Sequence, residues 1–262
     1  MKKLYFFIAL CINSARCLAT PEYVTNPCQS DGFGSQFQAI IAAAIYAELD
    51  HQQFVYSPFQ AMEHNYNNDP IFLTKKEEFI NFIGNFELNK GDIPPKVNYK
   101  PILDNYPELA AQSATLAKIK QIFRANKDTD HFKNGRFNIA IHVRRPNPQD
   151  NRIEGADTPD QLFLDVIGTL RIVYHYRNPL FHIYSQGDAE KFTAFRTDDI
   201  VLHLDEPLED TFLGLVFADV LVTSASSFSY TAALLSDGKV YYIPFWHKPF
   251  PGWISVYDLT SH

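Results

Sequence analysis

The second half of the chain alternates short apolar runs with stretches of helical pattern, and this alternation constrains the fold more than any other feature. The apolar runs predict strands at residues 137–144, 181–185, 200–204, 220–223 and 240–244. The stretches between them predict helices that begin near Thr158-Pro159 and span 188–195, 208–218 and 227–235. Strands that alternate with helices form parallel sheets covered on both faces. The second half is therefore predicted to be a doubly wound, Rossmann-like α/β domain.

The first half has a less regular pattern. An extended piece at 22–25 precedes a glycine-containing turn and a helix at 37–49 that is apolar on every side. A strand is predicted at 54–56, and helices are predicted near 75–83 and at 108–124. The stretch 61–100 is polar and irregular, and residues 125–136 form a polar link to the second half.

The N-terminus has the pattern of a secretory signal peptide. Lys2 and Lys3 precede an apolar run at 4–12, and Cys17-Leu18-Ala19 offers small residues for cleavage before Thr20. The run is short for a membrane span, and the alternative is a buried N-terminal strand. We predict a signal peptide at 1–19 and export to the secretory pathway, a lumen or a periplasm, with no membrane span after its removal. Cys28 would then be the one remaining cysteine, without an intramolecular partner.

Composition and charge limit the partners of the chain. Hydrophobic residues at 46% and charged residues at 20% are typical of a globular protein. The formal net charge of −7 implies no extended basic face, so nucleic acid is not expected as a partner. A positive spot on such an acidic chain favours a small anionic ligand.

The strand at 137–144 ends in a histidine and two adjacent arginines, His142, Arg144 and Arg145. Open α/β sheets bind their ligands at the carboxyl ends of strands. A planar guanidinium group can make two charge-assisted hydrogen bonds to phosphate oxygens, so the pair predicts a phosphate or diphosphate site. The alternative is a surface pair that caps the strand and forms salt bridges with acidic neighbours.

A hydroxyl-rich segment at 223–231 leaves the next-to-last predicted strand and enters a helix. Hydroxyl groups and free backbone N–H groups at a helix start can bind an anion without a lysine. The candidates here are Ser226, Ser227 and Ser229. By topology this segment lies on the same edge of the sheet as the arginines. The alternative is simple helix capping, for which one serine would suffice.

A glycine turn, Asp31-Gly32-Phe33-Gly34-Ser35-Gln36, precedes the first helix. It lacks the third glycine of a dinucleotide fingerprint and the Lys-Ser/Thr of a P-loop. A tight strand-to-helix turn explains it almost as well as ligand binding does.

Together these three motifs resemble the GDP-fucose-dependent fucosyltransferases, a superfamily that includes α-1,2, α-1,6 and protein O-fucosyltransferases. The resemblance is carried by the glycine turn with Gln36, by His-x-Arg-Arg at 142–145 and by Ser-Ser-Phe-Ser at 226–229, the last closest to the α-1,2 branch. It implies an α/β fold of the GT-B type, with two Rossmann-like domains facing a cleft. The N-terminal, acceptor-side domain would span 20–130 and the nucleotide-sugar-binding domain 131–262.

The resemblance also implies the function and the roles of residues. The chain would be an inverting hexosyltransferase that needs no metal and transfers fucose from GDP-fucose to a glycan or glycoconjugate. Arg145 would bind the donor diphosphate with Arg144 beside it, and His142 would help to shape the nucleotide pocket. Ser226, Ser227 and Ser229 would contact phosphate, and Gly32, Gly34 and Ser35 would border the donor.

The chain departs from this pattern at two places. Ser35 stands where the family often has asparagine, and Pro146-Asn147-Pro148 replaces the Gly-Asp-Tyr of the α-1,2 branch. Asp205, after the strand at 200–204, is a candidate for a guanine or ribose contact. The acceptor base stays open among Asp31, Glu63, His64 and Asp205, which are candidates by residue type only.

Other classes of function remain as alternatives. One is a non-catalytic GT-B relative that binds a nucleotide or glycan, and another is a glycosyltransferase for a different nucleotide sugar. A dinucleotide-dependent oxidoreductase ranks third, because the complete glycine fingerprint is missing.

Overall fold

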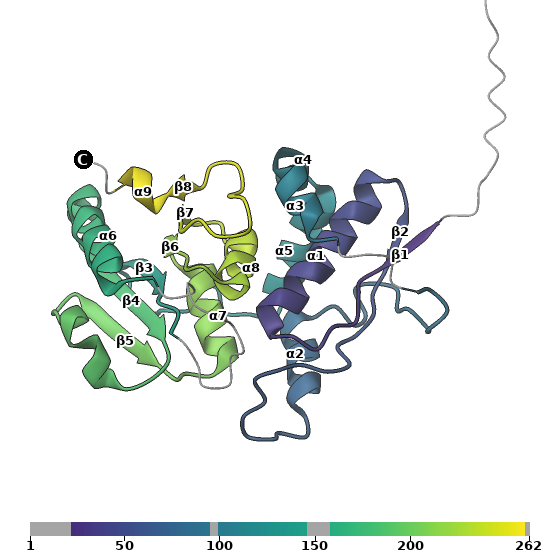
Figure 1. The fold of residues 1–262 in the computed structure, drawn as a ribbon, viewed down its shortest axis with the longest axis horizontal. Helices are drawn as coiled ribbons and strands as arrows, with labels where there is room; N and C mark the ends of the chain where they lie inside the picture. The colour runs from purple at the N-terminus through teal and green to yellow at the C-terminus, as the bar shows by residue number, and fades with distance from the viewer. Residues whose placement is uncertain (1–21, 95–98, 146–157, 260–262) are drawn as a thin grey trace, which may run out of the picture.

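The computed structural model describes residues 22–94, 99–145 and 158–259. The predicted signal peptide at 1–19 and the departure at 146–148 lie outside these residues. The fold class predicted from the sequence is confirmed: both halves are α/β with parallel strands, and the C-terminal half is doubly wound (Figure 1).

The C-terminal half is built on a six-stranded parallel sheet in the order β5-β4-β3-β6-β7-β8. Its strands are β3 (Phe137–His142), β4 (Pro179–Ser185), β5 (Ile200–Leu204), β6 (Val220–Val222), β7 (Lys239–Tyr242) and β8 (Ile254–Ser255). The order matches the 3-2-1-4-5-6 arrangement of Rossmann folds, which reverses direction between its first and fourth strands. Here that switch point lies between β3 and β6.

Helices cover both faces of this sheet. They are α6 (Asp160–Val173), α7 (Leu208–Phe217), α8 (Ser227–Leu235) and α9 (Val256–Leu259), with 3-10 turns at His175–Arg177 and Ala189–Phe195. Alternate residues of β3 serve the two faces. Ile139 and Ile141 pack in the core beneath α6, whereas Ala140 faces the core shared with α7 and α8. The segment predicted as a helix at 188–195 forms a 3-10 turn at Ala189–Phe195. The sequence did not predict β8 or α9.

The N-terminal half has more helix and less sheet. It contains β1 (Tyr23–Thr25), α1 (Phe33–Leu49), β2 (Gln53–Val55), α2 (Phe72–Ile80), α3 (Pro101–Asn105), α4 (Pro107–Ala111) and α5 (Ala114–Arg124). β1 and β2 pair in parallel. The predicted helix at 108–124 is divided, because Ser113 caps α5 by accepting a hydrogen bond from the Leu116 N–H at 3.1 Å.

Helix α1 begins at Phe33, four residues earlier than the sequence predicts. Gly32 is its N-cap, in an extended conformation, and Phe33 is buried. The apolar contacts of Phe33 favour a helical first turn over a free loop. Gly34 and Ser35 therefore belong to α1 and not to a turn before it.

The two halves share one hydrophobic core. α1 packs against α8, as Figure 1 shows where the purple helix meets the yellow-green one. The Phe33 ring lies 5.3 Å from that of Phe212 on α7, edge to face. The predicted division near residue 130 stays a prediction; the chain passes from α5 to β3 there.

Candidate functional site

The carboxyl ends of β3 and β6 bring two of the sequence motifs together. His142 is the last residue of β3, and Ser224 and Ser226 follow β6, its neighbour in the sheet. We call His142, Arg144, Ser224 and Ser226 the switch-point site. Ligands of open α/β sheets bind at such a position.

His142 is held by the loop that follows β6. Its Nδ1 lies 2.8 Å from the Ser224 hydroxyl oxygen, and its ring centroid lies 5.6 Å from that of Phe228. Burial lowers the pKa of His142 to about 3, and the positive charge of Arg144 acts in the same direction. The imidazole is therefore neutral at pH 7.

Arg144 reaches the serine loop directly. Its guanidinium donates a hydrogen bond to the Ser226 hydroxyl oxygen at 3.4 Å. Ser226 also caps α8, because the same oxygen accepts from the Phe228 N–H at 3.2 Å. A cationic side chain and the positive end of a helix thus meet at one serine, an arrangement suited to an anion.

Arg145 points to the other face of the sheet. It forms an ion pair with Asp160 in the first turn of α6, and its guanidinium carbon lies 5.1 Å from the centre of the Phe192 ring. Successive residues of an extended chain face opposite sides, so the two neighbouring arginines diverge. The salt-bridged alternative considered from the sequence is what the structure shows for Arg145.

The other two serines of the motif, Ser227 and Ser229, are buried. Ser229 is fully buried, and its hydroxyl oxygen accepts a hydrogen bond from the Ser224 N–H at 3.1 Å. The Ser226 carbonyl oxygen lies 3.4 Å from the same hydroxyl group. Ser227 is also buried, as the first residue of α8. Ser229 therefore shapes the loop.

The glycine turn of the N-terminal half contacts the start of α8, next to the switch-point site. A Cβ on Gly34 would lie 2.4 Å from the Phe228 Cα, so only glycine lets α1 approach α8 this closely. The Thr231 hydroxyl donates to the Gly34 carbonyl oxygen at 2.8 Å. The N-terminal ends of α1 and α8 therefore adjoin beside His142.

A polar cluster of Asp31, Ser35 and Lys100 stands at the start of α1. The Ser35 hydroxyl donates to Asp31 and accepts from the Lys100 ammonium, and the Lys100 Nζ lies 3.9 Å from the Asp31 Oδ2. Sequence reasoning missed Lys100, which lies 65 residues from Ser35 in an irregular stretch. It also missed Ser224 and Asp160, which nothing distinguished from other capping residues.

The four candidates for an acceptor base divide into two groups. Glu63 donates its N–H to the Ser30 carbonyl oxygen, and a Cβ on Gly32 would lie 3.0 Å from the His64 ring, so both lie near Asp31. Asp205 follows β5, the edge strand, and accepts from the Gly187 N–H at 3.1 Å. Two strand spacings, about 10 Å, separate β5 from β3. Asp205 lies on the predicted edge but outside the switch-point site.

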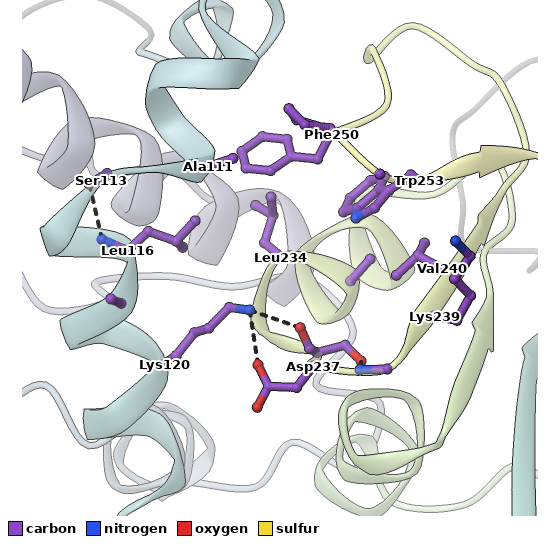
Figure 2. A pocket seen from close by; sticks show the side chains of 16 residues that line it. Ala111, Ser113, Leu116, Lys120, Leu234, Asp237, Lys239, Val240, Phe250 and Trp253 are labelled. Atoms are coloured by element: carbon purple, nitrogen blue, oxygen red, sulfur yellow. Dashed lines mark hydrogen bonds and ion pairs between the residues drawn. The ribbon is translucent and has the colours of Figure 1, made fainter.

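A separate cavity of about 460 Å³ opens between α5, the end of α8 and the loop before β8. Figure 2 shows Lys120 beside Asp237 on one side and Phe250 and Trp253 on the other. Because Lys239 begins β7, this cavity lies at the amino edge of the sheet. It is distinct from the switch-point site.

The described residues contain no cluster of three histidine, cysteine or carboxylate side chains that could hold a metal ion. In the linker, Asp128 and Asp130 close a local turn, because Asp128 pairs with Lys133 at 2.7 Å and Asp130 accepts from the Lys133 N–H. In the ranges that the structure describes, no helix is long and apolar enough to cross a bilayer.

No protein-family model and no curated protein matches the sequence. Among solved structures, the chain is similar to the α-1,6-fucosyltransferase NodZ crystallised with GDP (TM-score 0.45, 11% identity, 86% of this chain and 96% of that chain covered). It is similar to POFUT1 in complex with GDP (TM-score 0.46, 13% identity, 85% and 98% covered). It is also similar to the E. coli heptosyltransferase WaaC with ADP (TM-score 0.44, 12% identity, 89% and 90% covered). Similarity at this level leaves the function to be argued from the residues of the site.

Proposed function

We propose that the chain is a glycosyltransferase that transfers fucose from GDP-fucose to a hydroxyl group of a glycan or glycoconjugate. The observation that carries the proposal is the contact of Arg144 with Ser226 at the switch point of the sheet. It joins two motifs that resemble those of fucosyltransferases, 82 residues apart in sequence, at the place where open α/β sheets bind nucleotides. A guanidinium group beside a helix N-terminus suits the negative charge of a diphosphate.

The proposed chemistry is stabilisation of the leaving group. As the bond between sugar and phosphate breaks, negative charge grows on the diphosphate. Arg144 and the N-terminal end of α8 are already oriented to receive that charge, so little reorganisation is needed at the moment of reaction. A metal ion is not required in this scheme, and inversion follows if the acceptor hydroxyl attacks from the opposite side of the sugar.

Arg145 would join this site by exchanging its partner. Its side chain is 17% exposed and that of Asp160 is 38% exposed, so the ion pair is accessible to a competing anion. A diphosphate carries more charge than one carboxylate and offers a second pair of acceptor oxygens. We expect Arg145 to turn from Asp160 to the diphosphate when the donor binds.

The proton of the acceptor would go to the N-terminal half. His142 is a weak candidate for its base, because burial and the charge of Arg144 lower the pKa of the imidazole to about 3. Asp31, Glu63 and His64 lie together at the start of α1, and α1 packs closely against the start of α8 at Gly34. These three residues are therefore the candidates for the base.

We also propose that the protein is exported. A signal peptide at 1–19 would deliver the enzyme to the secretory pathway, a lumen or a periplasm, where glycan acceptors are found. N-terminal sequencing of the exported protein would reveal a new terminus at Thr20. An intact Met1 on protein from the exporting host would contradict this part.

A second candidate is a non-catalytic relative that binds a nucleotide without transfer. Two observations favour it: Arg145 is engaged by Asp160, and Ser35, in place of the usual asparagine, is engaged by Asp31 and Lys100. This candidate predicts donor binding without release of GDP.

Turnover distinguishes the two candidates. Purified protein is incubated with GDP-fucose, a panel of glycan acceptors and EDTA, and release of GDP is measured. An enzyme releases GDP only with a suitable acceptor, and Arg144→Ala should lower the rate about 100-fold, as for loss of one donor to a developing negative charge. Arg171→Ala, which removes an arginine paired with Asp199 elsewhere on α6, is the matched control and should leave the rate unchanged. GDP-fucose binding with no release supports the non-catalytic candidate.

A further inference from the structure

We infer that Ser224 is a positioning residue that fixes the tautomer of His142. Its hydroxyl donates to the His142 Nδ1, which places the ring proton on Nε2 and makes His142 a hydrogen-bond donor to an acceptor oxygen of the nucleotide. This inference deepens the proposed function and, for the identity of the ligand, rests on it. Nothing in the sequence motif alone distinguishes Ser224 from the other serines of its loop.

The direction of the hydrogen bond follows from the surroundings of Ser224. Its side chain is fully buried, so the hydroxyl proton must find a protein acceptor. The distance to the His142 Nδ1 is 2.8 Å, whereas the distance to the Ser229 hydroxyl oxygen is 3.4 Å. A proton given to Nδ1 makes a bond of normal length, and one given to Ser229 makes a poor one.

Ser229 is moreover already an acceptor. Its hydroxyl oxygen receives the Ser224 N–H at 3.1 Å, and the carbonyl oxygens of Ser224 and Ser226 lie 3.5 and 3.4 Å from it. If Nδ1 carried the ring proton, the Ser224 hydroxyl would lose its best acceptor while buried. The tautomer with the proton on Nε2 leaves Nδ1 free to accept from the buried Ser224 hydroxyl at 2.8 Å.

The loop keeps the Ser224 hydroxyl in place. On one side the Thr223 N–H donates to the Tyr241 carbonyl oxygen of β7 at 2.9 Å, and the Thr223 hydroxyl oxygen accepts from the Ile243 N–H, just after β7, at 3.1 Å. On the other side the Ser226 N–H donates to the Ser224 carbonyl oxygen at 2.8 Å. Buried between these bonds, the serine acts as a fixed donor and holds a neutral ring with Nε2–H as its remaining polar group.

Imidazole ¹⁵N spectra test the tautomer in the protein as purified, without any ligand. The His142 signals are assigned by their loss in His142→Gln. We expect a protonated Nε2 and an unprotonated, hydrogen-bonded Nδ1, unchanged between about pH 5 and 8. A proton on Nδ1 in the unmodified protein would overturn the inference directly.

Variants of Ser224 provide the second arm of the test. Ser224→Ala should broaden or shift the His142 signals and weaken binding of GDP about ten-fold. Ser224→Thr keeps the hydroxyl and should restore both. Ser113→Ala removes another buried capping hydroxyl, far from the switch-point site, and should change neither.

The outcomes separate this inference from the proposed function. An Nε2 tautomer in a protein that binds no GDP would leave Ser224 as the positioning residue and contradict the nucleotide ligand. GDP binding that is equal in Ser224→Ala and in the unmodified protein would overturn the positioning role. If Ser224→Ala does not fold, the spectrum of the unmodified protein and the threonine variant still decide.

Discussion

At the scale of single residues, the neighbours Arg144 and Arg145 have different surroundings and should behave differently when changed. Arg144 lies on the face of the sheet shared with His142 and contacts Ser226, which caps α8. Arg145 lies on the opposite face and is paired with Asp160. Their adjacency in the sequence suggested a single cationic point, but the extended backbone separates their side chains.

Asp160 should compete with the donor for Arg145. We predict that Asp160→Asn strengthens GDP binding several-fold, because the guanidinium is released for phosphate oxygens. The stability of the fold should change by less than about 1 kcal/mol, since the pair is partly exposed. Calorimetric titration and urea unfolding measure the two effects. Asp199→Asn, which breaks the Arg171 pair, is the control. Equal GDP affinity in Asp160→Asn and the unmodified protein would mean that Arg145 takes no part in binding.

At the scale of secondary structure elements, the close approach of α1 to α8 determines the shape of the site. Gly34 permits this approach, since any Cβ there would overlap the backbone of Phe228. The sequence motif drew attention to this glycine as part of a ligand-binding turn. The structure explains it by helix packing, which in turn places the start of α1 beside the start of α8.

Gly34→Ala should therefore force the two helices apart. We predict a loss of about 1–3 kcal/mol in the free energy of unfolding, typical of an overpacked contact. Gly168→Ala is the matched control: it also lies within a helix, α6, and its Cβ would meet nothing within 4 Å. That change should stabilise the protein by about 0.5–1 kcal/mol. Similar effects of the two substitutions would show that the α1–α8 contact is not tight.

A buried polar network links β3, β4 and β5 on the α7 side of the sheet. His182 is 4% exposed, and its Nε2 lies 3.0 Å from the Asn138 Oδ1 while its Nδ1 lies 2.9 Å from the His203 Nε2. Burial lowers the pKa of His182 to about 3, with a further contribution from His203. The folded chain therefore holds His182 neutral over most of the acidic range.

This network predicts loss of stability in acid. The unfolded chain binds a proton at His182 near pH 6.5, whereas the folded chain binds it only near pH 3. The free energy of unfolding should thus fall as the pH drops from about 6.5 toward 3, by up to about 1.4 kcal/mol per pH unit for each such histidine. Urea unfolding at a series of pH values measures this slope, to which His142 adds in the same direction.

Replacement of His182 by glutamine keeps hydrogen-bonding groups and removes the titration. The slope of the free energy of unfolding against pH should then be shallower by about 1.4 kcal/mol per pH unit, which corresponds to one proton. His175→Gln, at an exposed position in the 3-10 turn after α6, should leave the slope unchanged. An unchanged slope in His182→Gln would show that this histidine is not held neutral.

The elements of the C-terminal half could be predicted from the sequence more fully than those of the N-terminal half. The strand Ile200–Leu204 and the helix Ser227–Leu235 have the predicted bounds, because each is an apolar segment between clear turn signals. In the N-terminal half, α1 begins in a segment that resembles a loop, and its start is decided by contacts of Phe33 with α7 and α8. Such long-range contacts leave no local pattern.

The switch-point site was likewise predicted only in part. The sequence predicted that the histidine, the arginines and the serines share an edge of the sheet, and the order of strands confirms this. It did not predict which serine contacts which residue, because Ser224, Ser226 and Ser229 have the same chemistry and differ only in burial and partners. Lys100, which contacts Ser35, and Asp160, which pairs with Arg145, lie in segments without any motif.

At the scale of the whole molecule, the two halves form one unit around a cluster of phenylalanine rings. Phe212 of α7 lies within 5.9 Å of Phe33, Phe79 and Phe123, which come from three helices of the N-terminal half. On the amino edge of the sheet, Lys120 and Arg124 of α5 both pair with Asp237. Figure 2 shows the pair of Lys120 with Asp237 beside the cavity. The halves are thus joined by apolar contacts near the switch-point site and by ion pairs at the opposite edge.

This shared core predicts that the two halves unfold together. Calorimetry should show a single transition, and Phe212→Ala should lower its midpoint with a loss of about 3–5 kcal/mol, as for other buried phenylalanines. Two resolved transitions, with only one of them shifted by Phe212→Ala, would show that the halves are independent domains.

The central claim, that the switch point of the sheet is a nucleotide-sugar site, is tested most directly by calorimetric titration without added metal. Purified protein and its Arg144→Ala and Arg171→Ala variants are titrated with GDP, GDP-fucose, UDP and NAD. We predict that GDP and GDP-fucose bind to the unmodified protein and to Arg171→Ala, and that Arg144→Ala loses this binding. Tight binding of UDP or NAD without any response to GDP would contradict the fucose donor, and GDP binding that survives Arg144→Ala unchanged would contradict the site itself.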